Sequence, residues 1–228
     1  MSTLLEIHIG EIKKKLADLH RLAASSLTDA MEAFAKLDEK MGSEVKAKSS
    51  RVEDLSDNIE ANVFETIARR QPVASDLRKL ATYLLVSHSL YRVGRYAYKI
   101  AHIVTLCDGK EHFKDLESLP YLAEIAVKTL DIAMKGVLEE DLSGIDQLEK
   151  LEADSDRETS EMFQEIVDYL RKQRDITTMA MYYVIVGRYF ERAADHAFTI
   201  AERAWFMVTG NRKKLGLAFK GRSPQAPH

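Results

Sequence analysis

The chain has 228 residues, of which 46% are hydrophobic and 30% charged, and its formal net charge is −3. This length allows one large domain or two small domains with their own cores, and the apolar content excludes an intrinsically disordered chain. The near-neutral charge gives no support for a dedicated nucleic-acid-binding protein. A single cysteine excludes a disulfide framework and a zinc site built from several cysteines.

The sequence shows no segment that targets or anchors the protein. The first ten residues lack the basic stretch followed by an apolar stretch that a signal peptide has. The most apolar stretch, residues 179–186, is far shorter than the roughly 20 residues that a transmembrane helix needs. We therefore expect a cytoplasmic protein that meets a membrane only through its partners.

Glycine and proline divide the chain into six stretches whose apolar residues recur at helical spacing. The pattern predicts helices over residues 4–40, 44–70, 73–107, 118–139, 145–172 and 175–208, and hence an all-α fold. Gly42, Gly144 and Gly210 are expected at helix ends. Gly94 and Gly187 lie inside helices, where a missing side chain allows close packing.

The two halves of the chain are related in sequence. A shift of 100 residues matches the third predicted helix to the sixth, and a shift of 99 residues matches the second to the fifth. The matched pairs include Tyr83/Tyr183, Arg92/Arg192, Ala97/Ala197, Glu53/Glu152 and Asp57/Asp156. We predict two tandem three-helix bundle repeats, residues 1–112 and 113–210. Residues 211–228 form a basic tail that we expect to be disordered.

The second half carries two pairs of acidic residues with E-x-x-x-D spacing. This spacing places both carboxylates of a pair on one helix face, about 6 Å apart. The pairs are Glu152/Asp156 and Glu191/Asp195, and Glu202 lies on the same face as the second pair. A turn at residues 173–174 brings Asp156 and Glu191 to the same level of a helical hairpin, about 26 Å from the turn.

So many neighbouring carboxylates repel one another unless a cation lies among them. We therefore predict that Glu152, Asp156, Glu191, Asp195 and Glu202 bind divalent or trivalent metal ions, in a multinuclear cluster if several bind. Oxygen ligands favour Fe, Mn, Mg or Ca over Zn. The chain has no Glu-x-x-His motif, which weighs against a ferritin-like di-iron oxidase. Two alternatives remain open, a carboxylate-bridged metalloenzyme (hydrolase or oxidase) and a plain helical scaffold.

The first half keeps only part of this pattern. Glu53 and Asp57 form the matching acidic pair, but Tyr91, Arg95 and His102 stand where the second half has acids. We predict that Arg95 takes the place of a metal by forming a salt bridge to Glu53 or Asp57. This repeat is expected to hold little or no metal, and Glu53, Asp57 and His102 are weaker candidate ligands.

Both predicted hairpin tips are basic. One tip contains Arg69, Arg70 and Arg78, and the other contains Arg171 and Arg174. Cations at the C-terminal end of a helix compensate its partial negative charge. The alternative is that these residues dock on an acidic surface of a partner.

Two stretches of the chain resemble the PhoU family of phosphate-transport regulators. Residues 68–78, ARRQPVASDLR, match the family's A-R-R-Q-P-x-A-x-D-L-R run. Residues 190–202, FERAADHAFTIAE, are similar to its L-E-R-I-G-D-H-A-x-N-I-A-E run. The first repeat departs from the family, because Tyr91 and Arg95 replace the two acids of its L-E-R-I-G-D run.

The resemblance implies a six-helix architecture and no catalysis of its own. It implies an adaptor that negatively regulates phosphate uptake through the ATPase subunit of a phosphate ABC transporter. Such an adaptor also restrains a sensor histidine kinase and is commonly a homodimer. Within this resemblance Glu152, Asp156, Glu191 and Asp195 are metal ligands.

Overall fold

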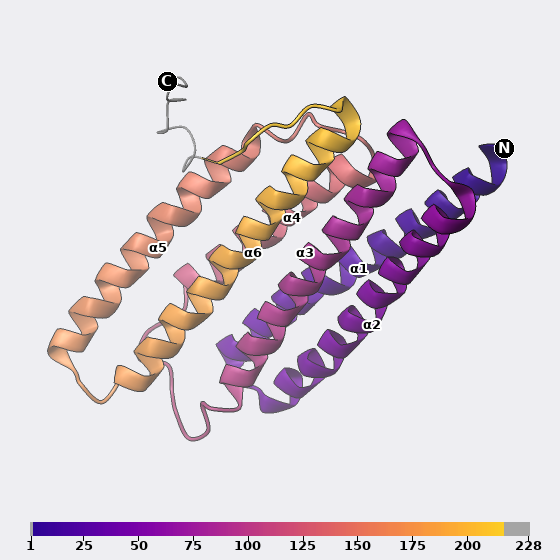
Figure 1. Cartoon of the computed structure of the whole chain (residues 1–228). Coiled ribbons are helices and arrows are strands. Elements are labelled where there is room, and N and C mark those ends of the chain that lie inside the picture. Colours follow the sequence, from indigo (N-terminus) through magenta and orange to yellow (C-terminus); the bar gives the residue numbers. More distant parts are fainter. Residues whose placement is uncertain (1, 217–228) are drawn as a thin grey trace, which may run out of the picture.

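The computed structural model describes residues 2–216. It contains six helices, α1 (Ser2–Lys36), α2 (Glu39–Arg70), α3 (Ala74–Val104), α4 (Ser118–Leu138), α5 (Gln147–Lys172) and α6 (Thr177–Thr209). No strand occurs in this part of the chain, so the predicted all-α class is confirmed. Helices α5, α6, α3 and α2 lie side by side, and α1 and α4 lie behind them (Figure 1).

The first helix break lies earlier than the sequence predicts. Helix α1 ends at Lys36, and Asp38 caps α2 by accepting a hydrogen bond from the Met41 backbone N–H at 3.0 Å. Gly42, which we expected in the break, is instead a buried residue of α2. A Cβ at this position would lie 3.3 Å from the Ala101 carbonyl oxygen of α3. The glycine therefore serves close helix packing and not chain reversal.

The two halves share one continuous core. Helix α3 packs along α6, and α1 packs on α4, so that the apolar faces of both halves meet. The connection between α3 and α4 is fixed by His112, whose Nε2–H donates to the carbonyl oxygens of Phe34 and Ala35, each at 3.1 Å. Its Nδ1 accepts a 2.8 Å hydrogen bond from the hydroxyl of the fully buried Tyr183. His112 thus ties α1, α6 and the linker together.

The outer helices pack differently in the two halves. Helix α2 lies closely on α3, with the Ser49 hydroxyl donating to the Gly94 carbonyl at 3.3 Å and the Ser56 hydroxyl donating to the Ser87 carbonyl at 3.4 Å. Helix α5 packs less extensively on α4 and α6. A groove of about 310 Å³ separates α5 from α4 near Leu151. The acidic helix is therefore the least tightly held of the six.

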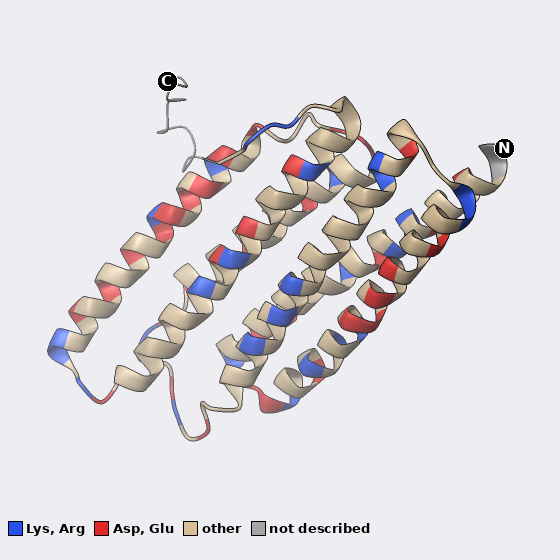
Figure 2. Ribbon diagram, viewed as in Figure 1, with Lys and Arg blue, Asp and Glu red and all other residues tan. Residues whose placement is uncertain are grey.

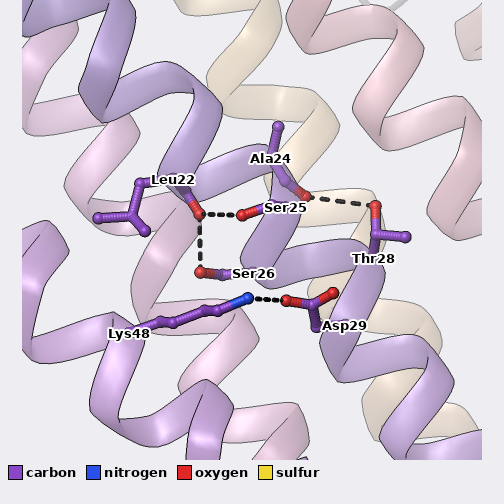
Figure 3. A network of polar contacts seen from close by, with 7 residues as sticks. All are labelled: Leu22, Ala24, Ser25, Ser26, Thr28, Asp29 and Lys48. Carbon is purple, nitrogen blue, oxygen red and sulfur yellow. Dashed lines mark hydrogen bonds and ion pairs between the residues drawn. The ribbon is translucent and has the colours of Figure 1, made fainter.

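Polar contacts also join α1 to α2 at the edge of the N-terminal half. The Asp29 carboxylate of α1 pairs with the Lys48 ammonium of α2, beside a hydrogen bond of 2.7 Å from the Ser26 hydroxyl to the Leu22 carbonyl (Figure 3). Ser26 is fully buried, so its hydroxyl needs this partner within its own helix. The Asp29–Lys48 pair therefore helps to hold α2 in register on α1.

The close approach of α2 and α3 gives a stability prediction. A Cβ at Gly94 would lie 2.7 Å from Cγ1 of Val52, a stiff branched side chain. A Cβ at Gly187 would lie 2.8 Å from Cε of Met162, the end of a flexible side chain. We expect Gly94→Ala to be less stable than Gly187→Ala by about 1–3 kcal/mol in urea unfolding. Equal stability of the two variants would show that α2 and α3 can move apart at Gly94 with little loss of free energy.

Candidate metal centre

Three of the five predicted ligands interact electrostatically where α5 faces α6. The charge of Glu191 acts on the Asp156 carboxylate of α5 and on the Asp195 carboxylate of α6. Partial burial, followed by the negative charge of Glu191, raises the pKa of Asp156 above its usual value. The same two causes raise the pKa of Asp195. The charges of these three acids therefore act on one another across the α5–α6 hairpin.

The other two acids lie nearer the C-terminal end of α6 and are approached by the chain that follows it. The Glu202 carboxylate accepts a hydrogen bond from the Leu215 backbone N–H at 3.0 Å and pairs with the Lys214 ammonium at 3.1 Å. Gly216 comes so near α5 that a Cβ on it would lie 3.2 Å from Oε1 of Glu152. Backbone and lysine thus occupy the space where the sequence predicts a cation.

This position of the chain corrects one prediction. Residues 211–216 belong to the tail that we expected to be disordered, but Leu215 is buried and the Lys213 ammonium lies 4.1 Å from the centroid of the Trp205 ring. The ordering follows from Glu202, because a partly buried carboxylate recruits backbone and lysine donors. Residues 217–228, the rest of that tail, lie outside the described residues.

The side chains do not form a ligand set for a metal ion as they lie. Among residues 2–216, no group of three or more histidine, cysteine, aspartate or glutamate side chains is arranged to hold one. Glu191 pairs with the Arg188 guanidinium of its own helix, and Glu202 with Lys214. Metal binding by these acids requires both side chains to leave their present partners.

The N-terminal half differs from its prediction in one contact. The Arg95 guanidinium forms no ion pair with the described residues and lies over the Tyr98 ring, 4.7 Å from the ring centroid. The Tyr91 hydroxyl donates instead to the Glu53 carboxylate at 3.4 Å. The predicted salt bridge of Arg95 is therefore wrong, because the ring three residues along the same helix face holds the guanidinium.

The remaining weak candidates of this half, Asp57 and His102, are both exposed. His102 lies in the last turn of α3, where its carbonyl oxygen accepts a 2.8 Å hydrogen bond from the Thr105 hydroxyl. Neither side chain belongs to a ligand group among residues 2–216. The structure therefore adds no support for a metal in this repeat.

The basic hairpin tips lie at opposite ends of the bundle, where α2 and α5 end (Figure 1). Arg69 pairs with Glu65 at 3.0 Å and Arg171 with Asp168 at 3.1 Å, each within its own helix. Arg70 and Arg174, one in each tip, are exposed. Both tips therefore keep a positive charge at a helix end, as the compensation of helix partial charges requires.

Arg78, the third arginine of the first tip, is held against α6. It is only half-exposed, and its Nε–H donates to the Met207 carbonyl near the end of α6 at 3.1 Å. Its guanidinium also lies 5.9 Å from the centroid of the Phe206 ring. Arg78 thus joins the start of α3 to the end of α6, and its part in a docking tip stays a prediction.

The raised pKa of Asp195 predicts a pH dependence of stability. Burial and the negative charges of Glu191 and Asp156 raise this pKa. The positive charges of Arg188 and Arg192 lower it, but by less. Because the folded-state pKa is raised, ionised Asp195 destabilises the fold, and this cost appears as the pH rises above the ordinary value of 3.8. We expect Asp195→Asn to stabilise the metal-free protein at neutral pH by about 0.5 kcal/mol.

This gain is expected to vanish below the ordinary carboxyl pKa, where Asp195 is protonated in both states. Urea unfolding at neutral and acidic pH measures it. Asp108→Asn, a change of an exposed loop carboxylate, serves as the control. If Asp195→Asn is less stable than the parent chain at neutral pH, the attraction of Asp195 by Arg188 and Arg192 outweighs burial and the repulsion by the neighbouring acids.

The chain belongs to the PhoU family. The PhoU domain of the family matches it twice, over residues 16–104 and residues 119–204. A relative from Thermotoga maritima, named as phosphate-specific transport system accessory protein PhoU homolog 1, is 26% identical over 204 residues, which are 89% of this chain and 88% of the relative. A homologue of the same system from Clostridium acetobutylicum is 24% identical over 213 residues, 93% of this chain and 97% of the relative.

Solved structures agree on the fold. The crystal structure of PhoU from Pseudomonas aeruginosa superposes with a TM-score of 0.84 at 23% identity, covering 90% of this chain and 99% of that protein. The regulatory protein PhoU from Streptococcus pneumoniae gives a TM-score of 0.83 at 21% identity, with 92% and 100% covered. The six-helix architecture expected from the sequence resemblance is therefore confirmed.

Proposed function

We propose that the chain is an accessory protein of a phosphate-specific transport system, which negatively regulates phosphate uptake. The observation that carries this proposal is the double match to the PhoU domain, together with relatives that bear this accessory role in their names over about nine-tenths of the chain. The role is regulatory, and the proposal includes no catalytic step.

The regulation is proposed to act by docking in the cytoplasm. No helix in residues 2–216 is both long enough and apolar enough to cross a bilayer. Contact with a membrane-bound transporter would then run through the ATPase subunit of the phosphate ABC transporter, and signalling through a sensor histidine kinase. A homodimer is the proposed assembly.

Metal binding by the acids of α5 and α6 is a second part of the proposal. Two observations support it, namely the repulsion that Glu191 exerts on Asp156 and Asp195 and the sparse packing of α5 on its neighbours. A divalent or trivalent ion would supply positive charge between the two helices. Binding would then stiffen the α5–α6 hairpin.

Direct binding to purified partners tests the accessory role. The full chain, immobilised for interferometry, is expected to bind the phosphate transporter's ATPase subunit and the sensor kinase from the same organism. The ATPase subunit of an unrelated ABC transporter serves as the control. Equal binding to both ATPase subunits, or binding to neither phosphate-system partner, would contradict the proposal.

A further inference from the structure

The solvent-facing side of α3 carries a continuous row of basic residues, which we call the α3 basic face. It consists of His88, Arg92, Arg95, Lys99 and His102. Their spacing of 4, 3, 4 and 3 residues keeps them within about 80° of arc and extends over about 21 Å of helix. Blue segments follow α3 along this stretch in Figure 2. The only acidic residue of α3, Asp76, lies in its first turn.

The three permanent cations of this face have no counter-ion among residues 2–216, since Arg92, Arg95 and Lys99 form no ion pair there. Each lies over an aromatic ring instead. The distances to the ring centroids are 5.7 Å for Arg92 over Tyr96, 4.7 Å for Arg95 over Tyr98 and 5.5 Å for Lys99 over Tyr189. Cation–π contacts fix these groups without neutralising their charge.

Helix α6 adds a fourth cation, Arg192, beside the middle of the face. Arg192 is exposed and forms no ion pair among residues 2–216. One turn further along α6, Nε2 of His196 lies 3.3 Å from the Tyr96 hydroxyl of α3, so the two helices meet here. The crossing of α3 and α6 thus gathers cations without acidic partners, which favours an anion.

Acidic residues on both sides limit the width of this anion. Glu53 and Asp57 are exposed on α2, and Glu191 and Asp195 lie on α6 near Arg192. Figure 2 shows red segments on the neighbouring helices on either side of α3. A broad anionic surface, such as a bilayer or a nucleic-acid duplex, would bring its charges against these carboxylates. A narrow, linear anion can follow α3 alone.

We propose that the α3 basic face binds an acidic segment of a partner protein, laid along the helix. Arginine guanidinium groups form paired hydrogen bonds with carboxylates, and the length of the face suits several carboxylates in a row better than one small ion. The proposal deepens the adaptor role proposed above and rests on that role for the existence of the partner. It is independent of metal binding and of the hairpin tips.

Binding of a model acidic peptide tests the proposal. A fluorescein-labelled peptide of about 12 residues, rich in glutamate, matches the length of the face when helical. We expect its anisotropy to report binding to the full chain at low salt. Arg92→Gln/Arg95→Gln/Lys99→Gln is expected to weaken binding by about tenfold or more. The control Arg69→Gln/Arg70→Gln/Arg171→Gln changes the net charge equally at the hairpin tips and should leave binding within about twofold.

Equal weakening in both variants would overturn the proposal, because net charge alone would then explain binding. No peptide binding by the parent chain would also overturn it, as would face-dependent binding of sodium polyphosphate or of anionic vesicles in place of the peptide. If the peptide is not bound while the transporter's ATPase subunit is, the accessory role survives and only the α3 face is wrong. Failure of both measurements would contradict both proposals.

Discussion

Replacing His112 by alanine is expected to lower the free energy of unfolding by about 3 kcal/mol, because several buried polar groups lose their partner together. The carbonyl oxygens of Phe34 and Ala35 and the hydroxyl of Tyr183 all bond to this one ring. Urea unfolding followed by circular dichroism measures the loss. His102→Ala removes an exposed histidine from α3 and should change stability by less than about 0.5 kcal/mol.

The Tyr183 hydroxyl can be removed separately to check the cause. Tyr183→Phe keeps the buried ring and is expected to cost about 1 kcal/mol. Combined with His112→Ala, it should cost less than the sum of the two single changes, because both remove the same hydrogen bond. Strict additivity would show that the hydrogen bond between His112 and Tyr183 contributes little, and that the loss on His112→Ala comes from the two carbonyl contacts and from packing.

Metal ions are expected to raise the melting temperature of the parent chain if the acids of α5 and α6 close around them. An ion at a hundred times its Kd stabilises the bound fold by about 2.7 kcal/mol, which is about 5–10 °C for a chain of this size. Scanning calorimetry with ferric iron, Mn²⁺, Mg²⁺, Ca²⁺ and Zn²⁺, each against a chelator, measures the shift. Glu191→Ala/Asp195→Ala should abolish it, since it removes both acids of α6 whose charges interact with that of Asp156.

The first repeat supplies the matched control. Glu53→Ala/Asp57→Ala removes the equivalent acidic pair of the N-terminal half and should leave the metal-induced shift intact. If both variants respond to metal as the parent does, the acids of α5 and α6 are not ligands. In chelator-treated buffer the Glu191→Ala/Asp195→Ala variant can melt at a higher temperature than the parent chain. That difference would reflect only the relief of repulsion among the acids.

The sequence predicts the helices well because their signals are local. Apolar residues at helical spacing define all six elements, and Gly210 ends α6 as expected, with a positive φ of 76° and its N–H donating to the Phe206 carbonyl at 2.9 Å. The break before α2 lies earlier than the predicted one, because Asp38 caps the helix and Gly42 lies inside it. An aspartate followed by a helical pattern is itself a start signal.

The candidate site was predictable only in part. Equal distances from a hairpin turn bring Asp156 level with Glu191, and this depends on helix rise alone. The return of Leu215 to Glu202 depends on how a tail folds back over two helices, for which no spacing in the sequence gives a rule. The basic row on α3 follows helical spacing and could have been found, but only the structure shows that its cations lack acidic partners.

The proposal that this chain restrains phosphate uptake is tested most directly by measuring that uptake in cells. The initial rate of labelled phosphate entry would be compared at high external phosphate between cells with the gene, cells without it and cells in which it is restored. We expect faster entry without the chain and a return to the original rate when the chain is supplied again. An uptake rate that is the same in all three would contradict the account.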